Sequence, residues 1–303
     1  MRFVTFEKNG AVRAGWLKDG GIVDMVTVSN GTLPEDILRL IQNYDIYQPI
    51  IKNQYLDCKP TDELNDVKLL APLPHPVTFR DFMCFREHPE HIAQSKGKPA
   101  QPAYYEIPVF YFSNPNTFLG PSQPVPFPKS SRYRDYEFEL GFVLGKGGMD
   151  IKPEDALSHV FGMTILCDWS ARDLQMAEQR LPLGPHKGKD FAVTTGPCLV
   201  TMDELMQYHV EGTRFNMEMV GFRNGNEFVR GNFFDIYHDL GAMIARASAD
   251  VMLYPGEIIG SGTLGGGCLY ELSADYEHTN WLSSGETIEF EVTGLGRLSM
   301  QIQ

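Results

Sequence analysis

The sequence predicts an α+β protein that is predominantly β, on the strength of three observations. Short apolar and β-branched runs alternate with Asn-Gly and Gly-Gly turns along most of the 303 residues, a pattern typical of strands. Helical periodicity is confined to a few stretches. The segment Ala71-Pro-Leu-Pro-His-Pro76 interrupts the pattern, because proline lacks an amide donor and fixes φ. We therefore expect a small N-terminal domain over residues 1–70 and a larger domain over residues 71–303.

The N-terminal part is expected to hold short strands followed by one helix. Turns at Asn9-Gly10 and Asp19-Gly20-Gly21 separate the strands. The helix is expected from Pro34 to Gln42, with Thr32 as its cap.

The larger part is expected to be mostly strands. A proline-rich stretch over residues 120–129 predicts an extended loop. The regular elements that follow are strands over 136–144 and 161–167, a helix over 170–178 with a capping box from Ser170 to Asp173, a hairpin at Asn224-Gly225, a helix over 235–247 and a strand over 257–259.

Composition excludes several classes of protein. The formal charge of -13, without any run of basic residues, argues against binding to nucleic acid. No stretch approaches the ~20 apolar residues needed to cross a bilayer, and the charged N-terminal segment does not resemble a signal peptide, so a cytoplasmic protein without a membrane partner is expected. The five cysteines form no CxxC pair, which indicates reduced side chains rather than a disulfide framework or a zinc site.

Three carboxylates suggest a cation site. Glu137 and Glu139 project from one face of the expected strand, because side chains alternate in a strand. Asp168 follows another apolar run, at the end of a strand. A half-exposed strand is the alternative interpretation of the two glutamates, but the apolar continuation Gly141-Phe-Val-Leu144 favours burial, and buried carboxylates require compensation. Clustered oxygens indicate a hard cation, Mg²⁺ first, with Mn²⁺ or Ca²⁺ as substitutes.

The residues around Asp168 carry a family resemblance. The segments Asp168-Trp-Ser-Ala-Arg-Asp-Leu-Gln175, Leu181-Pro-Leu-Gly-Pro185 and Gly188-Lys-Asp-Phe191 closely resemble the signature of the fumarylacetoacetate hydrolase family. The resemblance extends over roughly residues 71–300. It implies a mixed β-roll or sandwich-like catalytic domain with a few covering helices, and a homodimer.

The same resemblance implies a metal and a catalytic base. Glu137, Glu139 and Asp168 correspond to metal ligands of the family, and Asp81 is a candidate fourth ligand. His88, seven residues after Asp81, corresponds to the general base. Its carboxylate partner is either Glu271 or Glu90, and the correspondence favours Glu271.

Further residues match family positions that contact the substrate. Arg172 and Gln175 share one helical face at i and i+3, and with Lys189 they are candidate hydrogen-bond donors to an oxyanion. Tyr111 and Thr263 resemble substrate-binding positions. Nothing in the sequence around the histidines at positions 75, 91, 159 and 209 assigns them a role.

One motif is rejected. Gly260-Ser-Gly-Thr-Leu-Gly265 satisfies the G-x-G-x-x-G pattern, but the residues that follow suggest a strand instead of the helix that a dinucleotide site requires. These glycines are instead expected to allow positive φ and a close approach of the backbone to a ligand.

The function implied by the resemblance is hydrolysis of a C–C bond in a small anionic 1,3-dicarbonyl compound, similar to fumarylacetoacetate or an acylpyruvate. A divalent ion stabilises the departing enolate in such a reaction. Met83 departs from the pattern, because fumarylacetoacetase has an aromatic hydroxyl there, and the chain is shorter than typical fumarylacetoacetase. The alternative is a decarboxylase, isomerase or sugar-acid dehydratase of the same superfamily.

Overall fold

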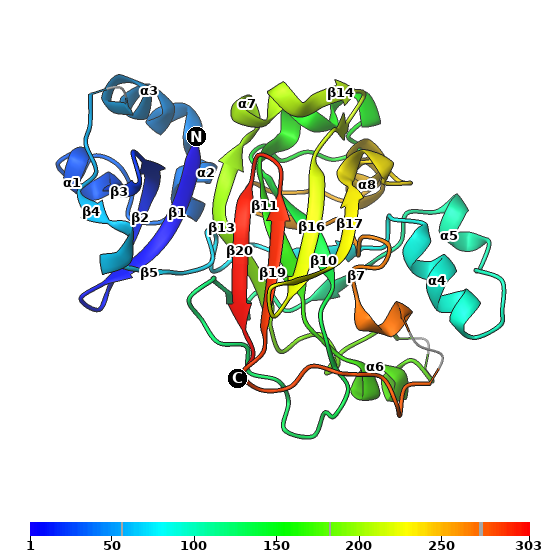
Figure 1. Ribbon diagram of the computed structural model, residues 1–303. Helices are drawn as coiled ribbons and strands as arrows, with labels where there is room; N and C mark the ends of the chain where they lie inside the picture. The colour runs from blue at the N-terminus through cyan, green and yellow to red at the C-terminus, as the bar shows by residue number, and fades with distance from the viewer. Residues whose placement is uncertain (56, 182, 273–274) are drawn as a thin grey trace.

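The computed structural model describes residues 1–55, 57–181, 183–272 and 275–303, so Pro182 of the family motif lies outside the described residues. The chain forms a large mixed sheet packed against a smaller antiparallel sheet, with helices at the edges (Figure 1). This is an α+β fold in which strands predominate over helices, as the sequence predicts.

Among its described residues, the N-terminal part contains a meander of short strands and three α-helices. The turns at Asn9-Gly10 and Asp19-Gly20 have positive φ at all four residues, which confirms both predicted turns. The predicted helix starts later than expected and has a different cap, because the Asp36 side chain accepts from the amide of Arg39 at 2.7 Å. Thr32 is therefore not the cap. The elements are β1 (Arg2–Lys8), β2 (Ala11–Lys18), β3 (Gly21–Asp24), α1 (Met25–Val28), α2 (Ile37–Gln42), α3 (Tyr44–Tyr55), β4 (Asp62–Glu63), η1 (Leu64–Asp66) and β5 (Lys68–Leu69).

The large sheet runs through the whole protein. Among the described residues its strand order is β4-β3-β2-β1-β13-β11-β10-β18-β6-β7, with β5 beside β1 and β8 beside β13. The strands of the N-terminal part thus continue the same sheet through the antiparallel β1–β13 pair. A division of the chain near residue 70 remains a prediction. The other strands are β6 (Phe79–Phe82), β7 (Phe110–Ser113), β8 (Phe118–Leu119), β10 (Phe138–Leu144), β11 (Val160–Asp168), β13 (Val193–Thr201) and β18 (Ile258–Gly260).

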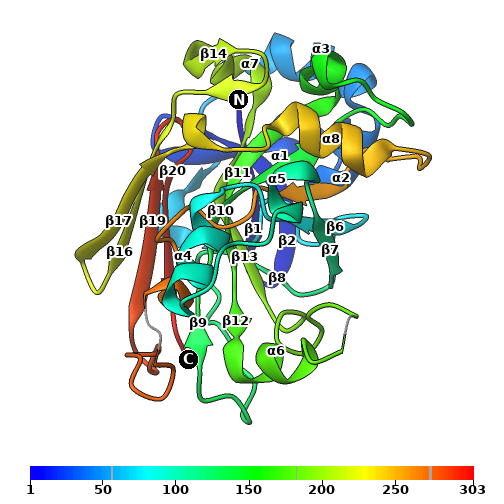
Figure 2. The ribbon, with the colours of Figure 1, turned by 90° about the vertical axis from the view of Figure 1, so that its right-hand side faces the viewer.

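A second sheet covers one face of the first. Its order is β17-β16-β19-β20, and the Phe138 and Phe290 rings stack across the gap with centroids 4.0 Å apart. Figures 1 and 2 show the two layers face to face, which is the predicted sandwich-like arrangement. The hairpin between β16 and β17 turns at Asn224-Gly225 with positive φ, as predicted. The strands are β16 (Glu218–Arg223), β17 (Asn226–Asn232), β19 (Thr287–Val292) and β20 (Gly296–Gln301).

Short helices and turns complete the molecule. Helices α4, α5 and α6 lie on the face shown in Figure 2. Within the described residues, no helix has the length and apolar character needed to span a bilayer. The remaining elements are α4 (Glu87–Ser95), α5 (Ala103–Glu106), β9 (Arg134–Asp135), η2 (Pro153–His159), β12 (Ser170–Ala171), α6 (Arg172–Glu178), α7 (Met202–Leu205), η3 (Met206–Tyr208), β14 (His209–Glu211), β15 (Arg214–Phe215), η4 (Phe233–Asp235), α8 (Leu240–Ser248) and η5 (Leu269–Glu271).

Two predicted helix starts are wrong. Ser170 lies in β12 and its hydroxyl donates to the carbonyl of Asp168, so it caps no helix. Asp173 instead accepts from the Ser131 hydroxyl and the Arg132 amide at 2.7 Å each, because this loop packs over the helix start. The helix predicted from residue 235 is preceded by η4 and begins at Leu240.

Strand register brings the acidic residues to one place. The pairing of Phe138 with Cys167 sets Glu137 opposite Asp168, whose amide donates to the Glu137 carbonyl at 3.2 Å. The parallel β18–β6 pair sets Gly260 beside Asp81, and the β6–β7 pair sets Asp81 beside Tyr111. Residues from five separate strands or strand ends therefore meet at one end of the large sheet.

Candidate active site

Three carboxylates form the centre of the site. One oxygen from each of Asp81, Glu137 and Asp168 lies within 4.8 Å of the others, and all three residues are buried. Glu139 lies beside this group, where its carboxylate accepts from the Gly262 amide at 2.9 Å. The structure thus brings acidic side chains from separate strands together, and their role as metal ligands remains a prediction.

Two features of the cluster suit a bound cation. Oδ1 of Asp81 and Oδ1 of Asp168 are buried without a hydrogen-bond partner, and buried acceptors normally have one. The backbone also leaves room for the carboxylates at Gly260, since a Cβ there would overlap Asp81 Oδ1 and lie 3.2 Å from Glu139 Oε2. The first glycine of the rejected G-x-G-x-x-G motif thus makes space for carboxylates.

Lys189 is the main positive charge inside the cluster. Its ammonium donates to Glu137 Oε2 at 2.5 Å and to Asp168 Oδ2 at 2.6 Å. Burial by itself raises the pKa of Glu137, but Lys189 and then Arg172 outweigh burial and lower this pKa below its usual range. Burial likewise lowers the pKa of Lys189, yet Asp168 and Glu137 raise it overall. Glu137 and Lys189 are therefore both charged.

The remaining carboxylates lack such compensation. Burial raises the pKa of Asp81 well above its usual range, and the neighbouring Asp168 adds to the effect. Burial followed by repulsion from Asp81 does the same for Glu139. Two protons or one divalent cation can offset this charge, because like charges in a buried site cannot all ionise uncompensated. An all-oxygen donor set fits Mg²⁺, Mn²⁺ or Ca²⁺.

Tyr111 and Thr263 contact the carboxylates. The Tyr111 hydroxyl donates to Asp168 and, at 3.2 Å, to Asp81. Thr263 Oγ1 lies 3.4 Å from Glu139 Oε1. Both side chains also line the cavity, so a substrate-binding role remains a prediction for each.

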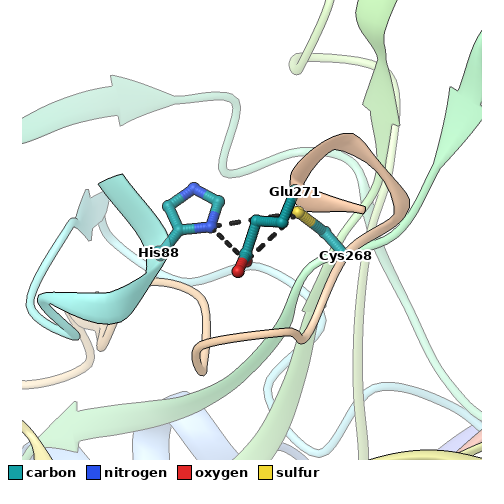
Figure 3. Close-up of side chains that lie close together, drawn as sticks. All are labelled: His88, Cys268 and Glu271. Atoms are coloured by element: carbon teal, nitrogen blue, oxygen red, sulfur yellow. Dashed lines mark hydrogen bonds and ion pairs between the residues drawn. The ribbon is translucent and has the colours of Figure 1, made fainter. Parts of the chain in front are cut away.

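Next to the carboxylates lies a histidine–glutamate pair (Figure 3). His88 Nδ1 lies 2.6 Å from Glu271 Oε1, and its Nε2 is 4.0 Å from Glu137 Oε1. Glu90 is engaged elsewhere, since it accepts from Tyr105 at 2.7 Å. The structure thus places Glu271, rather than Glu90, beside His88.

His91 is a residue that the sequence analysis left without a role. Its Nδ1 lies 2.7 Å from the second oxygen of Glu271, which also accepts from the Gly266 amide at 2.6 Å. The His-x-x-His spacing on a helix, from His88 to His91, was the available signal, because residues i and i+3 share one face. Glu271 is therefore fixed at both oxygens.

Arg172 joins the two halves of the site. Its Nε donates to Asp135 Oδ2 at 2.8 Å, its Nη2 pairs with Glu137 at 2.8 Å, and its Nη1 donates to Gln175 at 2.9 Å. Asp135, which the sequence analysis missed, is fully buried and also accepts from the amides of residues 136, 269 and 270. The available signal was the alternation of acidic residues at positions 135, 137 and 139, because Asp135 extends the Glu137 and Glu139 pattern by one step.

A cavity of about 340 Å³ gives access to these groups. Its walls carry carboxylates together with cationic and amide side chains. Apolar side chains from residues 82–83, 92 and 109–110 close the rest, including Met83. The lining residues that bear charge or amide groups are Asp81, His88, Lys96, Glu137, Arg172, Gln175, Gln179 and Lys189.

Comparison with known proteins adds relatives of several activities. A family model described as "Fumarylacetoacetate (FAA) hydrolase C-terminal" matches residues 78–303. The chain is 28% identical to a mitochondrial oxaloacetate tautomerase of Xenopus laevis, over 99% of this chain and 89% of the relative. It is 28% identical to fumarylacetoacetase of Oryza sativa subsp. japonica, over 75% of this chain and 64% of the relative.

Solved structures share the fold. Maleylpyruvate hydrolase from Sphingobium sp., in complex with manganese and pyruvate, superposes with a TM-score of 0.74 at 22% identity, over 100% of this chain and 98% of that chain. Because the family model covers about three quarters of the sequence, the chain belongs to the fumarylacetoacetate hydrolase family.

Proposed function

We propose that the protein is a divalent-metal-dependent hydrolase that cleaves a C–C bond in a small anionic 1,3-dicarbonyl compound of the acylpyruvate or fumarylacetoacetate type. The observation that carries the proposal is the buried His88–Glu271 pair at 2.6 Å, beside a carboxylate cluster with unpartnered oxygens. A base next to a cation site is what water activation beside a stabilised enolate requires.

The cation would be held by Asp81, Glu137 and Asp168, with Glu139 as a further ligand or as a group that orients Asp81. When bound, it supplies positive charge that polarises the dicarbonyl and stabilises the enolate. Mg²⁺ is our first choice for the native ion, and Mn²⁺ or Ca²⁺ are alternatives. The maleylpyruvate hydrolase structure with manganese supports an ion of this class.

His88 is the proposed general base. Glu271 accepts the Nδ1 proton, which leaves the Nε2 lone pair facing the cavity. Nε2 accepts a proton from water as the oxygen attacks the carbonyl carbon, and the imidazolium then returns that proton to the departing carbon. His91 and the Gly266 amide hold Glu271 in place, so His91 acts through Glu271 as a positioning residue.

Polar groups that line the same cavity as the base complete the proposed site. Gln175 keeps its amide nitrogen available, because its carbonyl accepts from Arg172. Arg172 also orients Glu137 through their 2.8 Å ion pair. Lys189 stands between the carboxylates and the cavity, where its ammonium can donate to an oxyanion. These three residues would stabilise charge that develops on the attacked carbonyl.

A second candidate is tautomerisation of oxaloacetate. The relative from Xenopus laevis that matches 99% of this chain is an oxaloacetate tautomerase. The same geometry serves this reaction, since His88 could move a proton between carbon and oxygen of a stabilised enolate. Tautomerisation consumes no water, whereas hydrolysis consumes one molecule of water per turnover.

Proton stoichiometry separates the two candidates. Hydrolysis of a 1,3-diketone by water yields a carboxylate, a ketone and one released proton per turnover near neutral pH, and tautomerisation releases none. We expect a weakly buffered assay with an acylpyruvate and Mg²⁺ to show one proton per C–C bond cleaved. Turnover of oxaloacetate without proton release, together with inert acylpyruvates, would instead establish the tautomerase. CO₂ trapping identifies decarboxylation in the same assay.

A matched variant checks the assigned base. His88→Gln should lower kcat by about 10²- to 10⁴-fold, the usual contribution of a general base. His75→Gln is the control, because His75 contributes nothing to the cavity lining. Equal rates in both variants would remove His88 from the mechanism.

Two further proposals concern the oligomeric state and the location of the protein. The family resemblance supports a homodimer, which light scattering after size exclusion tests. The acidic composition supports a cytoplasmic location, which cell fractionation tests.

A further inference from the structure

His88, which lines the substrate cavity, also belongs to a second buried group of potential metal ligands. Cys268, in the segment before η5, lies against the His88–Glu271 pair (Figure 3). We propose that His88, Cys268 and Glu271 form a second metal site that takes a borderline-soft divalent ion, Zn²⁺ first, and that is distinct from the all-oxygen cluster. The expectation of five cysteines without a metal role is thereby revised for one of them.

The distances approach those of a tetrahedral zinc site. Cys268 Sγ lies 3.9 Å from His88 Nδ1 and 3.5 Å from Glu271 Oε1, and Nδ1 and Oε1 are 2.6 Å apart. Zinc bonds of ~2.3 Å to sulfur and ~2.0–2.2 Å to nitrogen and oxygen give ligand separations of roughly 3.4–3.6 Å. On this estimate the Nδ1–Oε1 pair must separate by about 0.8 Å and the Sγ–Nδ1 pair must close by roughly 0.3 Å, so the His88 ring has to shift between its two partners while His91 and the Gly266 amide hold the other Glu271 oxygen.

The donor types select the ion. Sulfur, imidazole and carboxylate together suit Zn²⁺ or Co²⁺, whereas Mg²⁺ prefers oxygen donors and keeps several waters. On binding, the S–H bond of Cys268 breaks and its proton passes to solvent, while the single ring proton of neutral His88 moves from Nδ1 to Nε2 through water as the metal–ligand bonds form. The two sites are therefore expected to sort ions by softness.

The solvent-exposed neighbour of this group is His91, because the side chains of His88, Cys268 and Glu271 are buried. A separate hollow of about 340 Å³ is lined by His91, Gly266 and Glu271, among others. His91 is half exposed there, with Nδ1 at 2.7 Å from Glu271. The hollow offers a route for the ion, and water or His91 can take the fourth position that a zinc site requires.

Occupation of this site would block the proposed base. Metal at Nδ1 leaves the remaining proton of His88 on Nε2, so the ring can no longer accept a proton from water. Inhibition by zinc is the expected consequence. This consequence rests on the proposed function, but the site itself does not.

Cobalt spectroscopy tests the site without any substrate. We expect one equivalent of Co²⁺, added to the full-length protein in excess Mg²⁺, to produce a thiolate-to-cobalt charge-transfer band. Cys268→Ser should abolish the band and weaken Zn²⁺ affinity on the order of 100-fold or more, as loss of even an outer partner costs 10- to 100-fold. Cys198→Ser is the matched control, because Cys198 is also buried but contacts the Leu295 carbonyl instead.

A measurement on the wild-type protein removes dependence on folding of the variant. Zinc X-ray absorption should show one sulfur neighbour at about 2.3 Å. A shell of oxygen and nitrogen alone, or a cobalt band that persists in Cys268→Ser, overturns the inference. Turnover of acylpyruvates that Zn²⁺ does not inhibit would refute the regulatory consequence and leave the function intact. If zinc has a sulfur neighbour but the protein turns over no dicarbonyl, the proposed zinc site is supported and the proposed hydrolase function is refuted.

Discussion

Removal of the Lys189 ammonium should make the stability of the protein depend on a divalent cation. Lys189 is almost fully buried and bonds to two buried carboxylates at 2.5 and 2.6 Å. Lys189→Met keeps much of the side-chain volume but removes the charge. Breaking a buried ion pair on one side costs about 3–5 kcal/mol. That is a large part of the ~5–15 kcal/mol that stabilises a typical native protein.

The expected thermal shift follows from this cost. At roughly 2–4 °C per kcal/mol for chains of 150–250 residues, the metal-free variant should melt on the order of 10 °C below the wild type. A divalent ion at 100 times its Kd adds about 2.7 kcal/mol. In the variant the ion no longer competes with the ammonium, so Mg²⁺ should raise Tm more in Lys189→Met than in the wild type.

Differential scanning calorimetry in EDTA and in excess Mg²⁺ measures both effects. Lys187→Met is the matched control, because Lys187 is 71% exposed and pairs with Asp190 at the surface. The free energy of unfolding of Lys187→Met should stay within about 1 kcal/mol of the wild-type value and should not depend on metal. Equal shifts in the two variants, or a Mg²⁺ effect no larger in Lys189→Met than in wild type, would refute the reasoning.

Three other changes probe separate parts of the molecule. Gly260→Ala places a Cβ against the carboxylates and should weaken Mn²⁺ binding by about 10- to 100-fold in calorimetric titration, whereas Gly141→Ala, which meets only two side-chain methyls at 3.3 Å, should not. Glu271→Gln should lower kcat by about 10²-fold or more without a matching rise in KM, and unchanged kcat would exclude it as the partner of the base. Burial raises the pKa of Glu286, but the Arg223 hydrogen bond and further donors lower it overall. Since the folded pKa is depressed, the stability that Glu286 contributes is present above the usual glutamate pKa and lost as pH falls through the lower folded value. The free energy of unfolding from urea titration should therefore change less between pH 7 and pH 4 in Glu286→Gln than in the wild type.

The sheet-forming parts of the chain could be predicted from sequence, because strand patterns and glycine turns are local. The Asn224-Gly225 hairpin and the strand that became β11 follow from such signals. Helix starts could not be predicted as well. Ser170 and Asp173 have the spacing of a capping box, yet pairing of β12 with β9 and the contact of Asp173 with the 131–132 loop override it. Tertiary contacts decide such competitions.

The candidate site was accessible from sequence only through spacing and family resemblance. Alternation predicts that Glu137 and Glu139 share a face. It does not show that Glu139 accepts from the Gly262 amide and lies beside the three clustered carboxylates. Long-range partners such as Asp135 with Arg172, 37 residues apart, have no local signal. The His-x-x-His spacing was a local signal for His91, but its partner Glu271 is 180 residues away, so the sequence did not show what His91 contacts.

Anomalous diffraction from crystals grown with Mn²⁺ and oxalate tests most directly whether the acidic cluster holds the catalytic ion. We predict one manganese peak within bonding distance of Asp81, Glu137 and Asp168, with oxalate on the side that faces His88. A peak elsewhere in the molecule, or none despite bound oxalate, would contradict the account.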